Sequence, residues 1–166
     1  MSLLTIVDIR DRVMELCELI ALPSPYPLGT AYRDEKECSW KTGDLPAYVV
    51  EESGRGSEYL YNDPADPCAY LTRDTIRIIL YLSHIQDESY KKDFDNIDLV
   101  NRCKAVVIHF FAKRQKLQLD YEPYVDKAQI IRAGSPHTGA TSGAVSKNRI
   151  IVFNMAVEYM NFAEQG

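Results

Sequence analysis

The sequence predicts a single α+β domain over residues 1–166, in which a mainly antiparallel sheet with long strands is packed by two helices. Two patterns lead to this prediction. Apolar and polar residues alternate with a period of two in residues 72–85 and 148–162, as they do in strands. Apolar residues recur at spacings of three and four near residues 4–21 and 95–117, as they do in helices. This order is not the strand-helix alternation of parallel sheets, and the length suits one hydrophobic core.

The first predicted helix, residues 4–21, is amphipathic and needs a partner for its apolar face. Pro23 ends it, because proline cannot continue a helix. The polar face carries Asp8, Arg12, Glu15 and Glu18. The apolar face is expected to consist of Leu4, Val7, Val13, Leu16, Cys17 and Ile20.

Two segments rich in turn-forming residues surround the next strand. Residues 23–45 are predicted to form a loop that holds a short strand near residues 29–33. Residues 47–52 are predicted to form a strand. Residues 53–68 are predicted to form a second long loop, because they contain the breakers Gly54, Gly56, Pro64 and Pro67.

Residues 72–85, "TRDTIRIILYLSHI", predict an unusually long strand. One face is polar or aromatic, with Arg73, Arg77 and Tyr81. At roughly 3.3 Å per residue the strand spans about 45 Å, whereas strands of about 5 or 6 residues are usual. The other face is apolar and carries Ile76, Ile78, Leu80 and Leu82.

The second half of the chain begins with the helix predicted at residues 95–117. Acidic residues near its start and basic residues near its end complement the helix dipole. A strand in residues 124–134, a loop over residues 134–148 and the long closing strand at residues 148–162 follow. The apolar stripe of the helix is expected to consist of Ile97, Val100, Cys103, Val107, Phe110 and Phe111.

The composition, with 46% apolar and 26% charged residues, is typical of a globular protein. No apolar run approaches the roughly 20 residues that cross a bilayer. Asp8 and Asp11 interrupt the N-terminal apolar residues and no basic leader precedes them, so we expect a product of the cytoplasm. A net charge of -5 disfavours DNA coating, which needs clustered Lys and Arg, but suits a channel through which a duplex slides.

Four cysteines are widely spaced in the sequence. Cys17 and Cys103 fall on apolar helix faces, where a reduced thiol acts as a small hydrophobic group. Cys38 and Cys68 fall in predicted loops, and whether they pair stays open, because pairing depends on their geometry.

The sequence predicts no catalytic residue, no cofactor and no metal site. The three histidines, His84, His109 and His137, are isolated, whereas metal ligands usually occur in pairs at short spacing. The segment "GATSGA" is not followed by the Lys-Ser/Thr pair of a phosphate-binding loop and opens no helix. We therefore do not expect an enzyme, and a small metal-dependent hydrolase or nuclease that uses Asp and His residues is kept as an alternative.

Strands longer than one core requires indicate association, because exposed strand surfaces favour contact with other chains. The simplest partner is another copy, and head-to-tail contacts that close by rotation give a ring. Tyrosine is favoured at interfaces, and the chain has eleven tyrosines. The candidate interface residues are Tyr48, Tyr59, Tyr61, Arg73, Arg77, Tyr81, His137 and Tyr159.

The elements in this order resemble the tail terminator (tail completion) proteins of long-tailed bacteriophages. The segments that carry the resemblance are the N-terminal helix, "LPAYVV", "TIRIILYLSHI", "NRCKAVVIHFFAKR" and "IIVFNMAVEYMNF". The resemblance rests on hydrophobic patterns over nearly the whole chain, and the family has no catalytic residues to carry over. The segment "PSPYPLGTAYRDEKECSWKTGD" is an addition relative to shorter members.

The resemblance implies a structural virion protein of the phage tail and neck, made in the host cytoplasm. It implies a homo-oligomeric ring, a hexamer, that caps the tail tube, stops its polymerisation and meets the head-side connector. DNA then passes through the centre, and the acidic segment "DESYKKDFDNID" is a candidate lining of that passage, or else a solvated helix start. A head-tail stopper or adaptor is the alternative within the same class.

Overall fold

A computed structural model describes residues 5–34, 45–54, 56–63, 66–83, 93–117, 125–139 and 148–162. These residues form an α+β fold in which two helices pack on a mostly antiparallel sheet, as the sequence predicts. The elements along the chain are α1 (Ile6–Cys17), β1 (Thr30–Tyr32), β2 (Ala47–Glu52), β3 (Glu58–Asp63), β4 (Asp66–Leu82), α2 (Asp93–Ala112), β5 (Val125–Ala133), β6 (His137–Gly139) and β7 (Asn148–Phe162).

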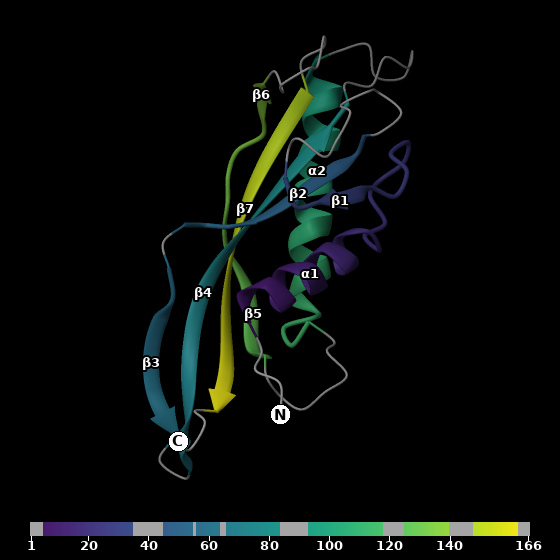
Figure 1. Cartoon of the computed structure of the whole chain (residues 1–166). Coiled ribbons are helices and arrows are strands. Elements are labelled where there is room, and N and C mark those ends of the chain that lie inside the picture. Colours follow the sequence, from purple (N-terminus) through teal and green to yellow (C-terminus); the bar gives the residue numbers. More distant parts are fainter. Residues whose placement is uncertain are drawn as a thin grey trace.

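The two longest strands, β4 and β7, form the centre of the sheet (Figure 1). They pair antiparallel from Ala69 opposite Phe162 to Leu82 opposite Arg149. The strand order is β1-β2-β4-β7-β5, and among the described strands only β1 and β2 pair in parallel. Both long strands expected from the alternating pattern are therefore present.

Each long strand has two shorter partners on its outer edge. One edge of β4 pairs with β2 and, further toward its start, with β3. The outer edge of β7 pairs with β6 at its start and with β5 beyond it. The part of the sheet that contains β3-β4-β7-β5, here called the outer half, extends past α1 (Figure 1).

The main core lies between the sheet and the two helices, which cover the same face (Figure 1). The alternation in β4 is confirmed, because Ile76, Ile78, Leu80 and Leu82 are fully buried on this face. Their partners on β7 include Ile151, Phe153 and Met155, which are also fully buried. The helices contribute Ile9, Val13, Leu16, Cys17, Leu99, Val100, Cys103, Val107 and Phe111.

Two residues expected on the apolar stripes are instead exposed. Val7 is 42% exposed, because α1 turns Ile9 toward the core in its place. Ile97 is 47% exposed, and Leu99 and Val100 begin the buried stripe of α2. Both misassigned residues lie in the first turn or two of their helix, where few neighbours surround a side chain.

A capping box fixes the start of α1. The Thr5 side chain accepts a hydrogen bond from the Asp8 amide at 3.3 Å, and the Asp8 carboxylate accepts one from the Thr5 amide at 3.0 Å. The helix ends at Cys17, before the predicted end at residue 21, and α2 likewise ends at Ala112, before residue 117. No helix among the described residues has the length and apolar character of a membrane span.

A smaller apolar cluster lies on the face opposite the helices, because alternate residues of β2 point to opposite faces of the sheet. Its buried members are Leu45, Ala47, Val49 and Tyr81. This cluster adjoins the end of β4 near Leu82, away from the outer half. The two faces of the sheet therefore differ, with one extensive core and one small apolar cluster.

The segments predicted to be loops contain additional strands. The short strand expected near residues 29–33 is confirmed as β1. The predicted loop over residues 53–68 is wrong, because it holds β3 and the start of β4, with Gly54 and Gly56 at positive φ before β3. The loop predicted over residues 134–148 contains β6, and its residues 140–147 lie outside the described part.

Candidate functional site

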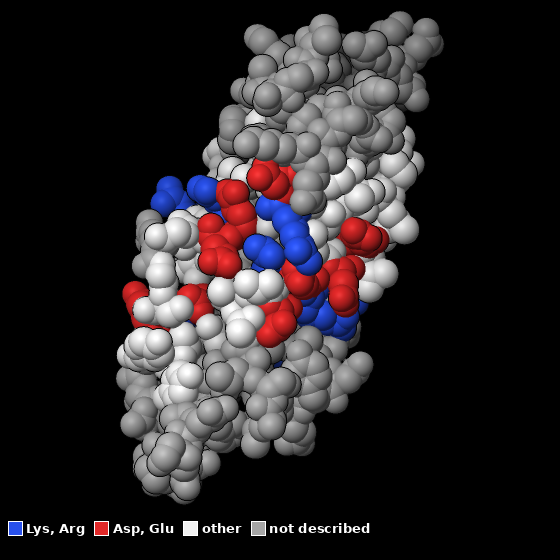
Figure 2. Space-filling view, in the orientation of Figure 1, with Lys and Arg blue, Asp and Glu red and all other residues white. Residues whose placement is uncertain are grey.

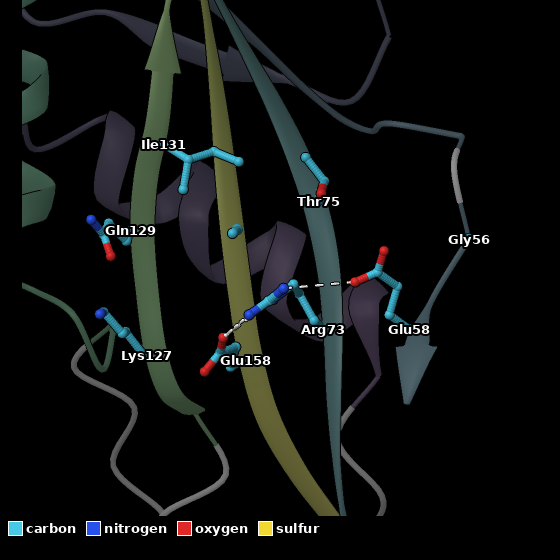
Figure 3. Close-up of a pocket in the computed structure, with 9 residues that line it drawn as sticks. Gly56, Glu58, Arg73, Thr75, Lys127, Gln129, Ile131 and Glu158 are labelled. Atoms are coloured by element: carbon cyan, nitrogen blue, oxygen red, sulfur yellow. Dashed lines mark hydrogen bonds and ion pairs between the residues drawn. The ribbon is translucent and has the colours of Figure 1, made fainter. Parts of the chain in front are cut away.

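Four charged side chains cross the outer half of the sheet on the face opposite the helices. Glu58 on β3 is paired with Arg73 on β4, Arg73 with Glu158 on β7, and Glu158 with Lys127 on β5. The charges alternate in sign from one outer strand to the other (Figure 3). Opposite charges on neighbouring strands attract, so the order favours this strand pairing. We call these four residues the charge ladder.

Arg73 holds the centre of the charge ladder. Its Nη2 and Nε atoms donate to Glu158 Oε1 at 2.6 Å and 3.2 Å, and its Nη1 lies 3.7 Å from Glu58 Oε2 (Figure 3). The hydrogen bond to Glu158 raises the pKa of Arg73 further above its usual value. The Arg73 side chain is 42% exposed, so these ion pairs orient the side chains more than they stabilise the fold.

The charge ladder lines a shallow depression of about 430 Å³. Arg73 and Glu158 lie between the strands in its centre, and Lys127 stands toward the β5 side (Figure 3). Within the described part of the chain, Lys127 makes no ion pair, although Glu158 is its neighbour on β7. The remaining lining residues are Gly56, Thr75, Gln129, Ile131 and Ala156.

A second polar group ties the same strands on the helix side of the sheet. Asp74 on β4 is only 6% exposed, and its two oxygens accept hydrogen bonds from two different segments of the chain. Ser57, just before β3, donates to Asp74 Oδ1 at 2.6 Å, and the Tyr159 hydroxyl on β7 donates to Oδ2. Burial raises the pKa of Tyr159, and the hydrogen bond with Asp74 raises it further. Side-chain contacts therefore connect the start of β3, β4 and β7 on both faces of the sheet: the Asp74 hydrogen bonds on the helix side and the Arg73 ion pairs on the other.

Three of the expected interface residues are buried inside the chain. Tyr48, Tyr81 and Tyr159 are 0%, 3% and 4% exposed. Their rings pack within the two apolar clusters, so we no longer assign them to an interface. Burial raises the pKa of Tyr48, which therefore stays protonated. Tyrosine content alone does not separate a core ring from a contact ring.

The other expected interface residues lie nearer the surface. Arg77 pairs with Glu51 on β2, on the same face as the charge ladder. Tyr59 on β3 is 76% exposed and meets Tyr70 edge to face, with ring centroids 5.9 Å apart. Tyr61 lies in β3 and His137 in β6, but their side chains are outside the described residues. Of the eight residues, the charge ladder includes only Arg73.

The sequence analysis did not single out Glu58, Lys127, Glu158, Asp74 or Ser57, and it assigned Tyr159 to an interface and not to a contact with Asp74. The signal was weak, because each is a single charged residue in a strand. Glu158 interrupts the apolar run "MAVEYM", and Asp74 lies within "TRDTIRI". Which residues meet depends on the register between strands far apart in the chain, and that register becomes visible only in the fold.

Cys17 and Cys103 are buried free thiols, as the sequence predicts. Burial raises the pKa of both thiols, to about 12 for Cys103, so at neutral pH neither forms the reactive thiolate. Cys38 and the side chain of Cys68 lie outside the described residues. Among the described residues, no three His, Cys, Asp or Glu side chains form a group that holds a metal ion.

Charges of both signs lie close together on the face of the molecule that Figure 2 shows. On α1, Arg12 lies 2.9 Å from Glu15, and Asp11 lies 3.2 Å from Arg33 near β1. His109 is exposed on α2. His84 lies outside the described residues, as do residues 87–92 of the acidic segment and the side chains of its residues 93–96.

The arrangement offers contact chemistry: alternating charges, a shallow depression and an exposed aromatic pair. Compared with models of known protein families and with curated proteins, the sequence has no match.

Proposed function

We propose that this chain is a ring-forming structural protein of a long-tailed bacteriophage, and specifically its tail terminator. In this role, copies of the chain form a hexameric ring on the end of the tail tube. The ring stops addition of further tube subunits and meets the head-side connector, and the DNA duplex passes through its centre. The protein is made in the host cytoplasm and ends in the virion.

The observation that supports this proposal is the long pair of β4 and β7. These strands span Asp66–Leu82 and Asn148–Phe162, and their outer half projects past α1 (Figure 1). The α1 residues of the core meet the sheet mainly through β1 and β2. A projecting part of a sheet with polar residues on one face, the exposed Tyr59 on the other and outer strands on both sides is suited to contact with other chains.

The charge distribution is compatible with a passage for DNA. The net charge of -5 comes with charges of both signs on the surface in view (Figure 2). A ring channel lined by a protein with this charge balance would hold few clustered cations to bind phosphate groups, so a duplex would move through it without tight binding. The order of helices and strands resembles that of the tail terminator family, and this resemblance is the reason for proposing a terminator in particular.

The test measures the mass of the protein in solution by light scattering, alone and with purified tail-tube protein. A terminator assembles into a closed ring, alone or on tube ends, and blocks further tube growth in an assembly assay. Association with the connector or portal protein without binding to tube ends assigns the chain to the head-tail stoppers or adaptors instead. If the protein has the mass of one chain under every condition, the proposal that it forms a ring is wrong.

A further inference from the structure

The charge ladder ends in opposite charges at the two sides of the outer half. It begins with the carboxylate of Glu58 on β3 and finishes with the ammonium group of Lys127 on β5. These two strands are the first and last of the β3-β4-β7-β5 order. One side of the sheet therefore presents a negative end and the other a positive end.

The charged groups at both ends of the charge ladder, on Glu58 and Lys127, are accessible to a second chain. The Glu58 side chain is 70% exposed and lies 3.7 Å from Arg73, which binds Glu158 more closely at 2.6 Å. Lys127 is exposed and has no ion-pair partner among the described residues. An alternating row of charges that stops at an acid on one side and a base on the other is complementary to itself.

We propose that copies of this chain contact one another head to tail through the charge ladder, with Lys127 of one copy against Glu58 of the next. The alternation of sign then continues from subunit to subunit. A head-to-tail contact uses two different patches on each copy, and such contacts generate rings when the rotation closes. This inference rests on the proposed function, in which copies of the chain form a ring.

In this proposal the side chains of Lys127 and Glu58 make the contact. The sheet is not continued from one copy to the next by main-chain hydrogen bonds at this position. The Ala128 amide on β5 already donates to the Gln115 carbonyl at 2.6 Å, so this position of the strand edge is occupied within its own chain. Ile131, on the same strand, is 60% exposed and lines the same depression as Lys127. It supplies apolar area beside the charged end, as interfaces require.

The experiment reverses one charge at a time in the full-length protein. Lys127→Glu places two acids against each other at every contact, and Glu58→Lys places two bases there. Each variant is expected to raise the concentration of half-assembly by at least about tenfold at low salt, because like charges across an interface are strongly unfavourable. The difference from wild type decreases as added salt screens the charges.

Mixing the two variants in equal amounts is the decisive measurement. In an alternating ring, each Lys127→Glu chain meets a Glu58→Lys chain on both sides. One contact is then the native Lys127 with Glu58 and the other is its reversal, so assembly is expected to recover to within about threefold of wild type. Recovery also shows that both variants are folded.

The control variants reverse charges of the same kind away from the charge ladder. Lys104→Glu within α2 and Glu52→Lys at the end of β2 change residues that are at least partly exposed, and both variants are expected to assemble as wild type does. If the ladder variants also assemble as wild type, or if the mixture does not recover, the inference is wrong while the ring proposal stands. A wild-type protein that stays single-copy, alone and with tail-tube protein, overturns both.

Discussion

The hydroxyl of Tyr159 on β7 donates a hydrogen bond to the carboxyl group of Asp74 on β4, inside the helix-covered face of the sheet. On the opposite face, the residues next to them in sequence, Arg73 on β4 and Glu158 on β7, form an ion pair. Arg73 Nη2 lies 2.6 Å from Glu158 Oε1. Successive residues of a strand point to opposite faces, so two adjacent positions on each strand are enough to connect both sides. The first of these contacts is buried and the second is partly exposed.

Removing the buried contact is expected to destabilise the protein. Tyr159→Phe deletes the hydroxyl that Asp74 accepts from, and a hydrogen bond to a carboxylate contributes about 1.5–3 kcal/mol to the free energy of unfolding. Urea unfolding measures the change. Tyr48→Phe is the matched control, because Tyr48 is also buried but its hydroxyl has no partner in the described structure. Equal losses in both variants contradict this role of Asp74.

Stability is expected to fall at alkaline pH. The pKa of Tyr159 is raised by burial and then by Asp74, so the folded chain keeps this proton at pH values where the unfolded chain has lost it. The contribution is therefore complete below the ordinary tyrosine pKa of about 10 and is lost as pH rises from there toward the raised folded value.

The same tyrosine allows this dependence to be measured. Unfolding free energies between pH 9 and pH 11 are expected to fall less steeply for Tyr159→Phe than for wild type, by up to about 1.4 kcal/mol per pH unit. Tyr48, whose pKa burial also raises, adds to the slope in both proteins. Identical slopes rule out a protonated, buried Tyr159.

Two isoleucines of the sheet, Ile78 on β4 and Ile131 on β5, are expected to contribute very differently to stability. Ile78→Ala removes a fully buried side chain opposite Phe153 and is expected to lower the free energy of unfolding by about 2–5 kcal/mol, because it leaves a cavity. Ile131→Ala truncates a side chain that is 60% exposed and is expected to change stability by less than about 1 kcal/mol. Thermal or urea unfolding compares the two, and a small effect at Ile78 contradicts the observed core.

Gly29 is expected not to tolerate a side chain. A Cβ atom there would lie 2.6 Å from the Tyr48 ring and 3.0 Å from the Pro46 carbonyl oxygen. Because Tyr48 is fully buried and cannot easily move away, Gly29→Ala is expected to destabilise the fold by about 1–3 kcal/mol. Gly134→Ala is the control, since among the described atoms its Cβ would approach only the Val152 carbonyl oxygen, at an ordinary contact distance of 3.6 Å. Calorimetric unfolding distinguishes the two variants.

Periodicity predicted most of the fold because it reports which face a residue buries. The pattern of Ile76, Ile78, Leu80 and Leu82 is enough to identify a half-buried strand, and the core confirms it. It failed where turn-forming residues occur inside strands. Residues 53–68 contain glycines and prolines that favour a loop, yet β3 pairs with β4 from Glu58 onward, because pairing between strands overrides local propensity.

The charge ladder was less predictable than the fold. Arg73 was expected at an interface, but its partners Glu58 and Glu158 lie 15 and 85 residues away in the chain, and no local pattern joins them. Tyr48 illustrates the opposite error, since its residue type favoured an interface and its place on β2 buried it. A single sequence records residue types and periods, whereas contacts depend on register.

The uninterrupted pairing of β4 with β7 has a mechanical consequence. The outer pairs β3-β4 and β5-β7 contain register shifts, near Tyr59 and near Ile130, where a strand bends readily. The pairing of β4 with β7 from Ala69 to Leu82 contains no register shift, so we expect it to resist bending more than the outer pairs do. We therefore expect a displacement of the Phe162 end of this pair to move its Leu82 end as well, with any bending confined to the outer pairs that contain the register shifts.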